Sequence, residues 1–248
     1  MIAQLDNDSA TAVRTALDRD GFTILKGALA GEPIRDFASG IAAMFAPHSL
    51  PGEDVLTACD RIGREDNALL HRIYLYSRYS YAMNRMRQFC FGIARDLLPN
   101  LGFYLDIDSG VIFCTPGDET RTWRWHQEST YHHEMVDSIG FWFPIFAPAT
   151  KLNGAMSVLK GTHKLGKINY VKHKSSAEAA TSLIPEGIDD YCQKYEEVHT
   201  TCDVGDCVLF DKNLIHRSNM NRSDKARITG LVRVGTTPVV PPKIDKVY

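Results

Sequence analysis

The sequence contains no long hydrophobic run, little net charge and no closely paired cysteines. No stretch approaches the ~18 apolar residues in a row that a membrane-spanning helix requires, and the N-terminus has no basic region followed by an apolar run. The formal net charge is -2 at pH 7, so no overall field attracts nucleic acid or an anionic membrane. We therefore expect a soluble cytoplasmic protein with neither nucleic acid nor a membrane as its partner.

Cysteine is present without a pattern. The six cysteines are scattered, lack a CxxC spacing and mostly have apolar neighbours: Cys59, Cys90, Cys114, Cys192, Cys202 and Cys207. A disulfide framework or a redox pair would require a more regular spacing. We expect reduced cysteines that fill the hydrophobic core.

The composition suits one large domain. The chain has 248 residues, of which 44% are hydrophobic and 23% are charged, and a chain of this length buries a substantial core. Apolar residues at helical spacing predict a helix over 33–45 and another over about 79–98. The second helix would have one apolar stripe, made of Tyr79, Met83, Met86, Phe89, Ile93 and Leu97. Residues 1–100 are thus predicted to be mostly helical, within a single domain that spans 1–248.

After residue 100 the pattern changes to short apolar runs bounded by Gly, Pro, Asn and Asp: "SGVIFCTPGD", "SIGFWFPIF", "GAMSVLKGT", "GDCVLFD" and "RITGLVRV". Strands that follow one another without intervening helices are typical of a sandwich, a jelly roll or a barrel. We predict a mainly β core with flanking α-helices over 101–236. A polar insertion at about 163–203 would interrupt this core, and 237–248 would form an extended tail.

A candidate metal site begins in the stretch "RWHQESTYHHE". His126 and Glu128 are two residues apart, so on a strand or an extended loop their side chains point to the same side. A distant apolar run leads into His216, which supplies a second imidazole. Two histidines and one carboxylate form the facial triad of non-heme Fe(II) oxygenases, but the same set also holds catalytic zinc. The ligand types alone leave the metal open.

Arg227 distinguishes between these metals. It follows His216 in the chain, and Thr229 falls on the same face of the predicted strand. A guanidinium beside a hydroxyl is suited to bidentate binding of a carboxylate in a partly desolvated pocket. A dicarboxylate that chelates iron through its 2-oxo acid end would need such an anchor at its other end.

The sequence resembles the phytanoyl-CoA dioxygenase type of Fe(II)/2-oxoglutarate dioxygenases over nearly its whole length. "LDRDGFTILKGAL" is similar to the opening helix and strand of that family, and "WHQE" is similar to its HxD/E motif. "NGAMSVLKGTHKLG" is similar to its Asn-Gly strand and Gly-Ser/Thr-His turn, and "GDCVLFDKNLIHRSNMNRSDKAR" to its distal His, Ser, Asn and Arg block. Four motifs in the family's order are far more specific than HxE alone.

The resemblance implies a double-stranded β-helix (jelly roll, cupin-like) core and an iron site. By position, the Fe(II) ligands would be His126, Glu128 and His216. Glu128 stands where Asp is commoner in the family. Because it is neither Gly nor Ala, no position is vacated for chloride as in related halogenases, and we expect hydroxylation or another oxidative outcome rather than halogenation.

The resemblance also implies a co-substrate site. Arg227, helped by Thr229, would bind the distal carboxylate of 2-oxoglutarate, and Trp142 would line the same pocket. With O2, such an enzyme releases succinate and CO2 while it hydroxylates a small-molecule substrate.

Neighbouring polar residues receive other interpretations. Adjacent residues on a strand point in opposite directions, so at most one of His132 and His133 can face the metal, and neither is expected to contact substrate. Tyr131 lies nearer the predicted mouth of the site than His132 and His133, and is the better candidate of the three for contact with substrate. Ser218 and Asn221 are expected to shape the loop that carries His216, because short polar side chains bond to nearby backbone in turns.

The substrate is less well defined by the sequence. The basic insertion favours a small polar or anionic metabolite or biosynthetic intermediate, and an acyl-CoA thioester is the alternative. The arginines of 61–87 are expected in part to border the mouth of the site. Two other classes stay open: a metal-dependent hydrolase or isomerase that uses the same triad, and a non-catalytic binding module. The sequence makes no prediction of oligomeric state.

Overall fold

The computed structural model describes residues 5–98, 103–106, 108–132, 137–173 and 181–237. Its helices are α1 (Asn7–Asp20), α2 (Glu32–Phe45), α3 (Val55–Glu65), α4 (Asn67–Ser77), α5 (Tyr81–Leu97) and α6 (Ile188–Lys194). Its strands are β1 (Phe22–Leu25), β2 (Phe103–Asp106), β3 (Gly110–Cys114), β4 (Asp137–Pro144), β5 (Ser157–Leu159), β6 (Tyr170–His173), β7 (Ser182–Pro185), β8 (Glu197–His199), β9 (Cys207–Asp211), β10 (His216–Arg217) and β11 (Arg227–Thr237). None of these helices has the length and apolar character needed to cross a membrane.

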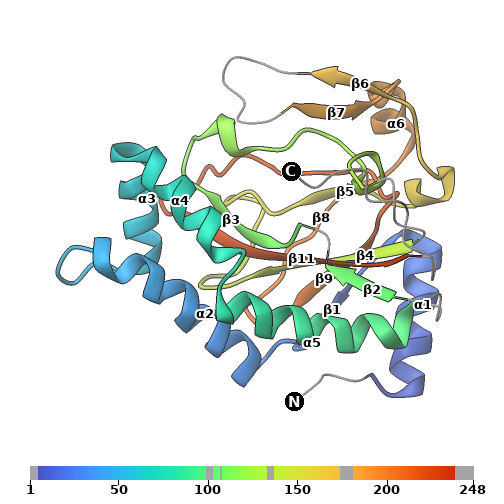
Figure 1. The fold of residues 1–248 in the computed structure, drawn as a ribbon. Helices are drawn as coiled ribbons and strands as arrows, with labels where there is room; N and C mark the ends of the chain where they lie inside the picture. The colour runs from blue at the N-terminus through green and yellow to red at the C-terminus, as the bar shows by residue number, and fades with distance from the viewer. Residues whose placement is uncertain (1–4, 99–102, 107, 133–136, 174–180, 238–248) are drawn as a thin grey trace, which may run out of the picture.

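Two antiparallel sheets form the core. The larger sheet has the order β1-β9-β4-β11-β2, and β3 pairs with β11 next to β2; the smaller sheet has the order β10-β5-β8. In Figure 1, α2 and α5 lie below the larger sheet. The β6–β7 hairpin and α6 lie at the top of the picture, on the opposite side of the molecule from these two helices. The arrangement is the predicted double-stranded β-helix, or jelly roll, with flanking helices.

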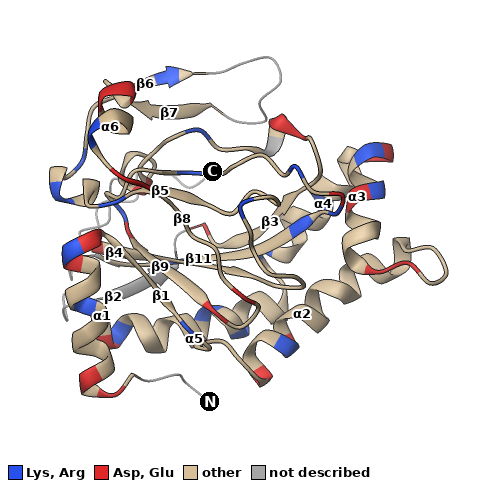
Figure 2. Cartoon of the chain, turned by 180° about the vertical axis from the view of Figure 1, so that it is seen from behind, with Lys and Arg blue, Asp and Glu red and all other residues tan. Residues whose placement is uncertain are grey.

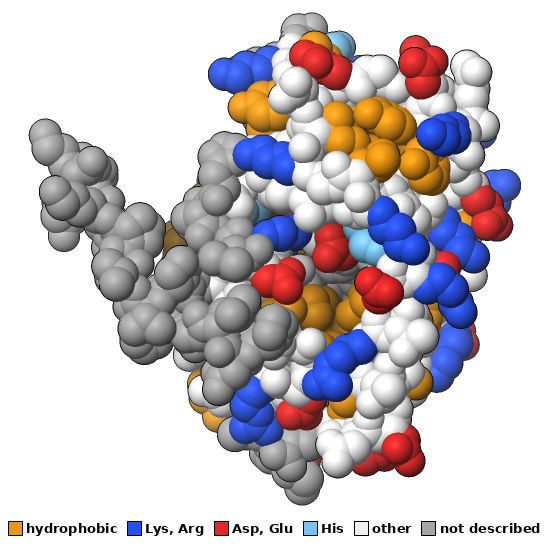
Figure 3. All heavy atoms as spheres, turned by 90° about the vertical axis from the view of Figure 1, so that its right-hand side faces the viewer, with side chains coloured by type: hydrophobic (Ala, Val, Ile, Leu, Met, Phe, Trp, Pro, Cys, Tyr) orange, Lys and Arg blue, Asp and Glu red, His pale blue; other side chains and the backbone are white. Residues whose placement is uncertain are grey.

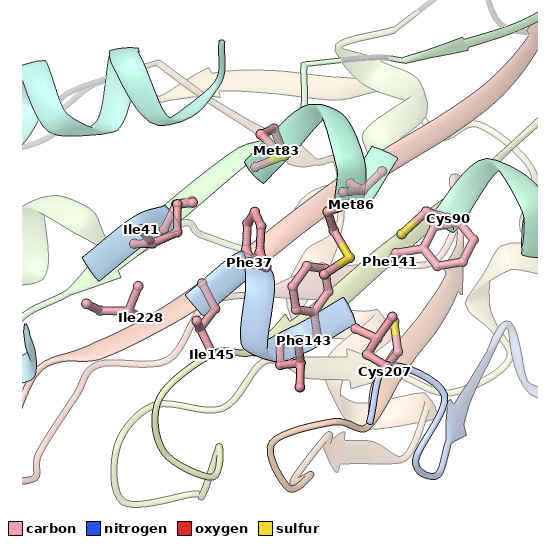
Figure 4. Close-up of a cluster of buried hydrophobic side chains, with 14 of the residues drawn as sticks. Phe37, Ile41, Met83, Met86, Cys90, Phe141, Phe143, Ile145, Cys207 and Ile228 are labelled. Atoms are coloured by element: carbon pink, nitrogen blue, oxygen red, sulfur yellow. The ribbon is translucent and has the colours of Figure 1, made fainter. Parts of the chain in front are cut away.

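Alternate residues of the central strands face different surroundings. Phe141 and Phe143 of β4 point toward the helices, where the ring of Phe143 lies 5.6 Å from that of Phe37 in α2. Met83 of α5 joins the same cluster (Figure 4). Trp142, between the two phenylalanines, instead packs in the cluster between the two sheets. Because side chains alternate along a strand, the larger sheet is covered by helices on one face and encloses the site on the other.

Two sequence predictions need correction, and a third cannot be compared with the structure. The helix predicted from residue 79 begins at Tyr81, after the N-cap Ser80, and Tyr79 is 82% exposed rather than part of the apolar stripe. The insertion is narrower than 163–203, because β8 pairs with β5 in the smaller sheet. The predicted tail lies outside the described residues after Thr237.

The cysteines are mostly buried, and the charged side chains of both signs are mixed over the molecule. Cys192 is exposed and the other five cysteines are buried, and the described part of the chain holds no disulfide. Charged residues of both signs are spread over the helices and loops (Figure 2). The face in Figure 3 likewise mixes acidic and basic side chains around hydrophobic ones. Among the described side chains, the face in Figure 3 shows no area that is charged with one sign alone.

Candidate metal centre and co-substrate pocket

A cavity of about 490 Å³ lies between the two sheets. Its wall is drawn from α4, several strands and the loop before β4, so residues distant in sequence meet around it. The lining includes five of the six residues predicted for the site: His126, Glu128, Trp142, His216 and Arg227. Thr229, the sixth, is fully buried behind this wall.

His126 and His216 face each other across a short antiparallel bridge. The backbone N–H of each donates to the carbonyl of the other, at 2.9 and 3.0 Å, and the ring centroids are 4.2 Å apart. Nδ1 of His126 lies 2.7 Å from the Arg124 carbonyl, and Nδ1 of His216 lies 2.9 Å from the Leu214 carbonyl. Since a carbonyl only accepts, Nδ1 carries the proton in both rings, and both Nε2 atoms present lone pairs.

Glu128 supplies the carboxylate beside this histidine pair. It begins a short 3-10 turn (Glu128–Thr130), and its Oε1 lies 3.5 Å from Nε2 of His216. Donor atoms of His126, Glu128 and His216 all lie within 4.8 Å of one another, and all three residues are buried. Oε1 has no hydrogen-bond partner among the described residues. A buried carboxylate oxygen left in this way is suited to a metal ion.

The protonation states also suit a metal. Burial, together with the nearby His216, lowers the pKa of His126 to about 3, so this imidazole is neutral at ordinary pH. Burial alone would raise the pKa of the Glu128 carboxyl, but Arg233 and the two histidines together hold it well below its usual value. Metal binding requires neutral imidazole and ionised carboxylate. This donor set fits a divalent cation with open coordination positions.

Gln127 fixes the direction of the two residues around it. It is fully buried and points away from the cavity. Its Nε2 donates to the carbonyls of Gly166 and Asn213 at 2.9 and 2.6 Å, and its Oε1 accepts from the N–H of Ile168 at 2.9 Å. Because alternate residues of an extended segment point oppositely, this anchor turns its two neighbours toward the cavity. Sequence reasoning had assigned Gln127 no role.

Arg227 is held in the wall by three neighbours. Its Nε donates to the Asn153 carbonyl at 3.0 Å, its Nη1 donates to the Thr229 hydroxyl at 3.2 Å, and its guanidinium lies 5.4 Å above the ring of Trp142. No described residue accepts a hydrogen bond from Nη2. Thr229 therefore orients Arg227, and the guanidinium has donors available for an anion in the cavity.

An aromatic wall stands over the histidine pair. The ring of Tyr131 meets those of His126 and Trp123 edge to face, at 5.8 and 6.0 Å. The Tyr131 hydroxyl accepts a hydrogen bond from the N–H of Leu183 in β7 at 2.9 Å, and Ser182 of the same strand lines the cavity. The hairpin of the insertion is thus tied to the site through Tyr131. Trp123 was not identified from the sequence.

Other predicted residues lie in mixed positions. His132 and Ser218 line the cavity, and His133 lies outside the described residues. Asn221 is buried and donates to the carbonyls of Cys114 and Lys225 at 2.9 and 2.8 Å, which supports its expected role in the loop. The described cavity wall contains none of the arginines of 61–87; His71 and Tyr74 line it instead.

The family model described as "Phytanoyl-CoA dioxygenase (PhyH)" matches residues 17–229. The chain belongs to the phytanoyl-CoA dioxygenase family. The match includes all six predicted site residues, from His126 to Thr229. The resemblance inferred from the sequence motifs is therefore confirmed.

Individual relatives of this family member are distant. A "Phytanoyl-CoA dioxygenase domain-containing protein 1 homolog" of Dictyostelium discoideum is 29% identical over 137 residues, which are 53% of this chain and 47% of the relative. The match thus spans about half of that relative's length. The ectoine dioxygenase of Halomonas elongata is 24% identical over 240 residues, which are 90% of this chain and 69% of the relative.

Solved structures show that the fold is shared. The structure titled "EctD from S. alaskensis with 2-oxoglutarate and 5-hydroxyectoine" superposes with a TM-score of 0.58 at 18% identity, covering 94% of this chain and 79% of that one. EvdO2 from Micromonospora carbonacea var. aurantiaca superposes with a TM-score of 0.60 at 15% identity, covering 98% and 97%.

Proposed function

We propose that this chain is a non-heme Fe(II)- and 2-oxoglutarate-dependent dioxygenase that hydroxylates a small polar metabolite or biosynthetic intermediate. The convergence of His126, Glu128 and His216 donor atoms within 4.8 Å, in a cavity that Arg227 also lines, supports it most strongly. We assign these three residues as the iron ligands and 1–248 as one catalytic domain. The structure of a similar protein with 2-oxoglutarate agrees with this choice of co-substrate.

The residues of the chain bind and orient, while Fe(II), 2-oxoglutarate and O2, when bound, would supply the oxidising power. 2-Oxoglutarate would leave as succinate and CO2, with one oxygen atom of O2 in succinate and the other in the hydroxylated product. Both histidines keep Nδ1 bonded to backbone, so that neutral Nε2 faces the metal position. Arg227 would receive the distal carboxylate of 2-oxoglutarate in a desolvated pocket, where a charge-assisted hydrogen bond is strong. Thr229 holds the guanidinium in that orientation, and Trp142 closes the pocket beside it.

The cavity favours an uncharged polar substrate over an anionic one. Besides Arg227, the charged side chains of the described wall already have partners: Arg217 pairs with Glu197, Arg233 with Glu128 and Asp108 with Arg78. The described lysines of the basic insertion do not line the cavity. Hydroxyl groups of the described wall come from Tyr74, Thr120, Thr122, Tyr131, Ser182 and Ser218. Aromatic rings beside hydroxyls suit a ligand that has both apolar faces and hydrogen-bonding edges.

The first test is anaerobic titration of Fe(II) and then 2-oxoglutarate into metal-free protein, followed by visible absorption. A weak charge-transfer band should appear with wild-type protein and be absent from His216→Ala at the same concentrations, with the fold retained by circular dichroism. If wild-type protein binds iron and no band forms, the triad serves a different chemistry. In that case a metal-dependent hydrolase or a binding module becomes the better assignment.

The substrate class is tested by succinate formation. Neutral polar compounds, organic acids and short acyl-CoA thioesters should be compared at equal concentrations with Fe(II), 2-oxoglutarate and O2 present. We expect neutral polar compounds to accelerate 2-oxoglutarate consumption most. Preferential acceleration by an acyl-CoA would instead support the thioester alternative.

A further inference from the structure

Arg233, a residue of β11 without a sequence-assigned role, lies beside the carboxylate of Glu128. Its Nε is 2.9 Å from Oε2 in an ion pair that is not aligned as a hydrogen bond, and the two side chains are 16% and 6% exposed. Its Nη1 donates to the Asp108 carbonyl at 2.7 Å. The guanidinium is therefore held by a hydrogen bond to backbone and paired by charge with Glu128, and Arg233 lines the same cavity as the proposed ligands.

The two oxygens of Glu128 have different surroundings. Oε2 faces the Arg233 guanidinium, whereas Oε1 lies 3.5 Å from Nε2 of His216 and has no hydrogen-bond partner among the described residues. The positive charge of the guanidinium attracts Oε2 and favours the orientation of Glu128 in which this oxygen faces Arg233. Only Oε1 is then left facing the histidine pair.

We infer that Arg233 is a positioning residue that holds Oε2 of Glu128 and directs Oε1 toward the metal. This inference rests on the proposed function. A glutamate has one more rotatable bond than the aspartate that is commoner in the family, so more side-chain freedom is lost when it is ordered. Arg233 orders the longer side chain before the metal arrives. Groups that orient ligands from behind in this way tune metal affinity.

The backbone around Asp108 supports the position of Arg233. The N–H of Arg233 donates to the Ser109 hydroxyl at 3.2 Å. Asp108 has a left-handed backbone with φ of 55°, a conformation that Asp tolerates better than most residues. Its side chain pairs with Arg78, which follows α4. The carbonyl that receives Arg233 is thus anchored to the helical flank.

A positioning role and a purely electrostatic role of Arg233 predict opposite changes in metal affinity when the residue is removed. If Arg233 acted only as a positive charge near a divalent cation, its removal would strengthen metal binding, because like charges repel. If it positions Glu128, its removal weakens metal binding. Arg233→Lys separates the two further: it keeps the charge but loses the planar fork that reaches both Glu128 and Asp108.

The test measures Co(II) binding to metal-free protein by visible absorption, without 2-oxoglutarate. Arg233→Gln should weaken Co(II) binding by about 10- to 100-fold, and Arg233→Lys by an intermediate factor. Arg227→Gln is the matched control, because it removes a charge from the same face of β11 without touching Glu128; its Co(II) affinity should equal that of wild type. Circular dichroism and melting curves check the fold of each variant.

A double-mutant cycle with Glu128→Asp excludes a general structural effect. The shorter carboxylate cannot reach both the metal and Arg233, so Arg233→Gln should weaken binding far less in that background. Equal losses in the two backgrounds, or unchanged or tighter binding by Arg233→Gln alone, would overturn the inference. If His126→Ala and His216→Ala leave Co(II) binding unaffected, the proposed function fails instead.

Discussion

Replacement of Arg227 tests how the co-substrate is bound. Arg227 is 3% exposed, and its guanidinium is fixed by Asn153 and Thr229 at 3.0 and 3.2 Å. Two changes are informative: Arg227→Ala removes every donor, and Arg227→Lys keeps the charge with a single nitrogen. Both should weaken 2-oxoglutarate binding while leaving Fe(II) affinity unchanged.

The expected size follows from the hydrogen bonds that are lost. A bond from a charged donor contributes about 1.5–3 kcal/mol, so a bidentate pair contributes about 3 kcal/mol or more. Since about 1.4 kcal/mol corresponds to a tenfold change in affinity, Arg227→Ala should weaken 2-oxoglutarate binding by about 100-fold or more. Arg227→Lys retains about one such bond, and should weaken binding by about 10-fold.

The assay is titration of 2-oxoglutarate at saturating Fe(II) under anaerobic conditions, with the charge-transfer band as signal. Arg233→Gln serves as the reciprocal control, because at saturating metal its 2-oxoglutarate affinity should be close to that of wild type. Wild-type affinity in Arg227→Ala would refute the carboxylate anchor. A loss of Fe(II) affinity equal to the loss of 2-oxoglutarate affinity would show a disturbed site instead of a lost anchor.

Three further substitutions test the surroundings of the site. Tyr131→Phe removes the hydroxyl that accepts from the N–H of Leu183, so amide hydrogen exchange at Leu183 should accelerate; unchanged exchange would show that the hairpin is held elsewhere. Gly140→Ala would place a Cβ 2.3 Å from the ring of Phe210, and the overpacking should cost about 1–3 kcal/mol in urea unfolding; wild-type stability would contradict this. Burial raises the pKa of the Asp211 carboxyl above its ordinary value of 3.8, so this group favours the folded state at low pH and destabilises it once the pH rises through that range. Asp211→Asn should therefore raise the melting temperature at pH 7 and change it little at pH 3, and an equal change at both would refute the assignment.

Much of the fold could be predicted because apolar runs have distinct lengths and spacings. "GFWFPIF" is apolar at consecutive positions, which agrees with a β4 strand buried on both faces. β8 could not be found in this way, because Glu197–His199 is short and polar and is defined by its pairing with β5. Tyr79 extends the apolar spacing of α5. The Ser80 hydroxyl, however, accepts a hydrogen bond from the N–H of Met83, so Ser80 is the N-cap and the helix begins after Tyr79. That capping serine was a readable signal.

The candidate site was predictable where local spacing decides direction. Two residues apart, His126 and Glu128 face one side, as expected. The spacing does not show what holds them there. Gln127 bonds to segments of chain far from it in sequence, and Tyr131 bonds to Leu183 in the insertion. Such contacts depend on how loops return in space, which local patterns do not encode.

The contact of Arg233 with Glu128 also could not be predicted from local sequence, but the side of β11 on which Arg233 lies could be. Alternation along β11 places Arg227, Leu231 and Arg233 on the cavity side, and all three line it. At ~3.3 Å per residue, the two arginines are separated by about 20 Å along one central strand. The co-substrate anchor and the residue that positions Glu128 are therefore set by a single rigid element. One residue inserted between them would turn one arginine out of the cavity, so such a variant should lose either 2-oxoglutarate binding or metal affinity while the other arginine keeps its function.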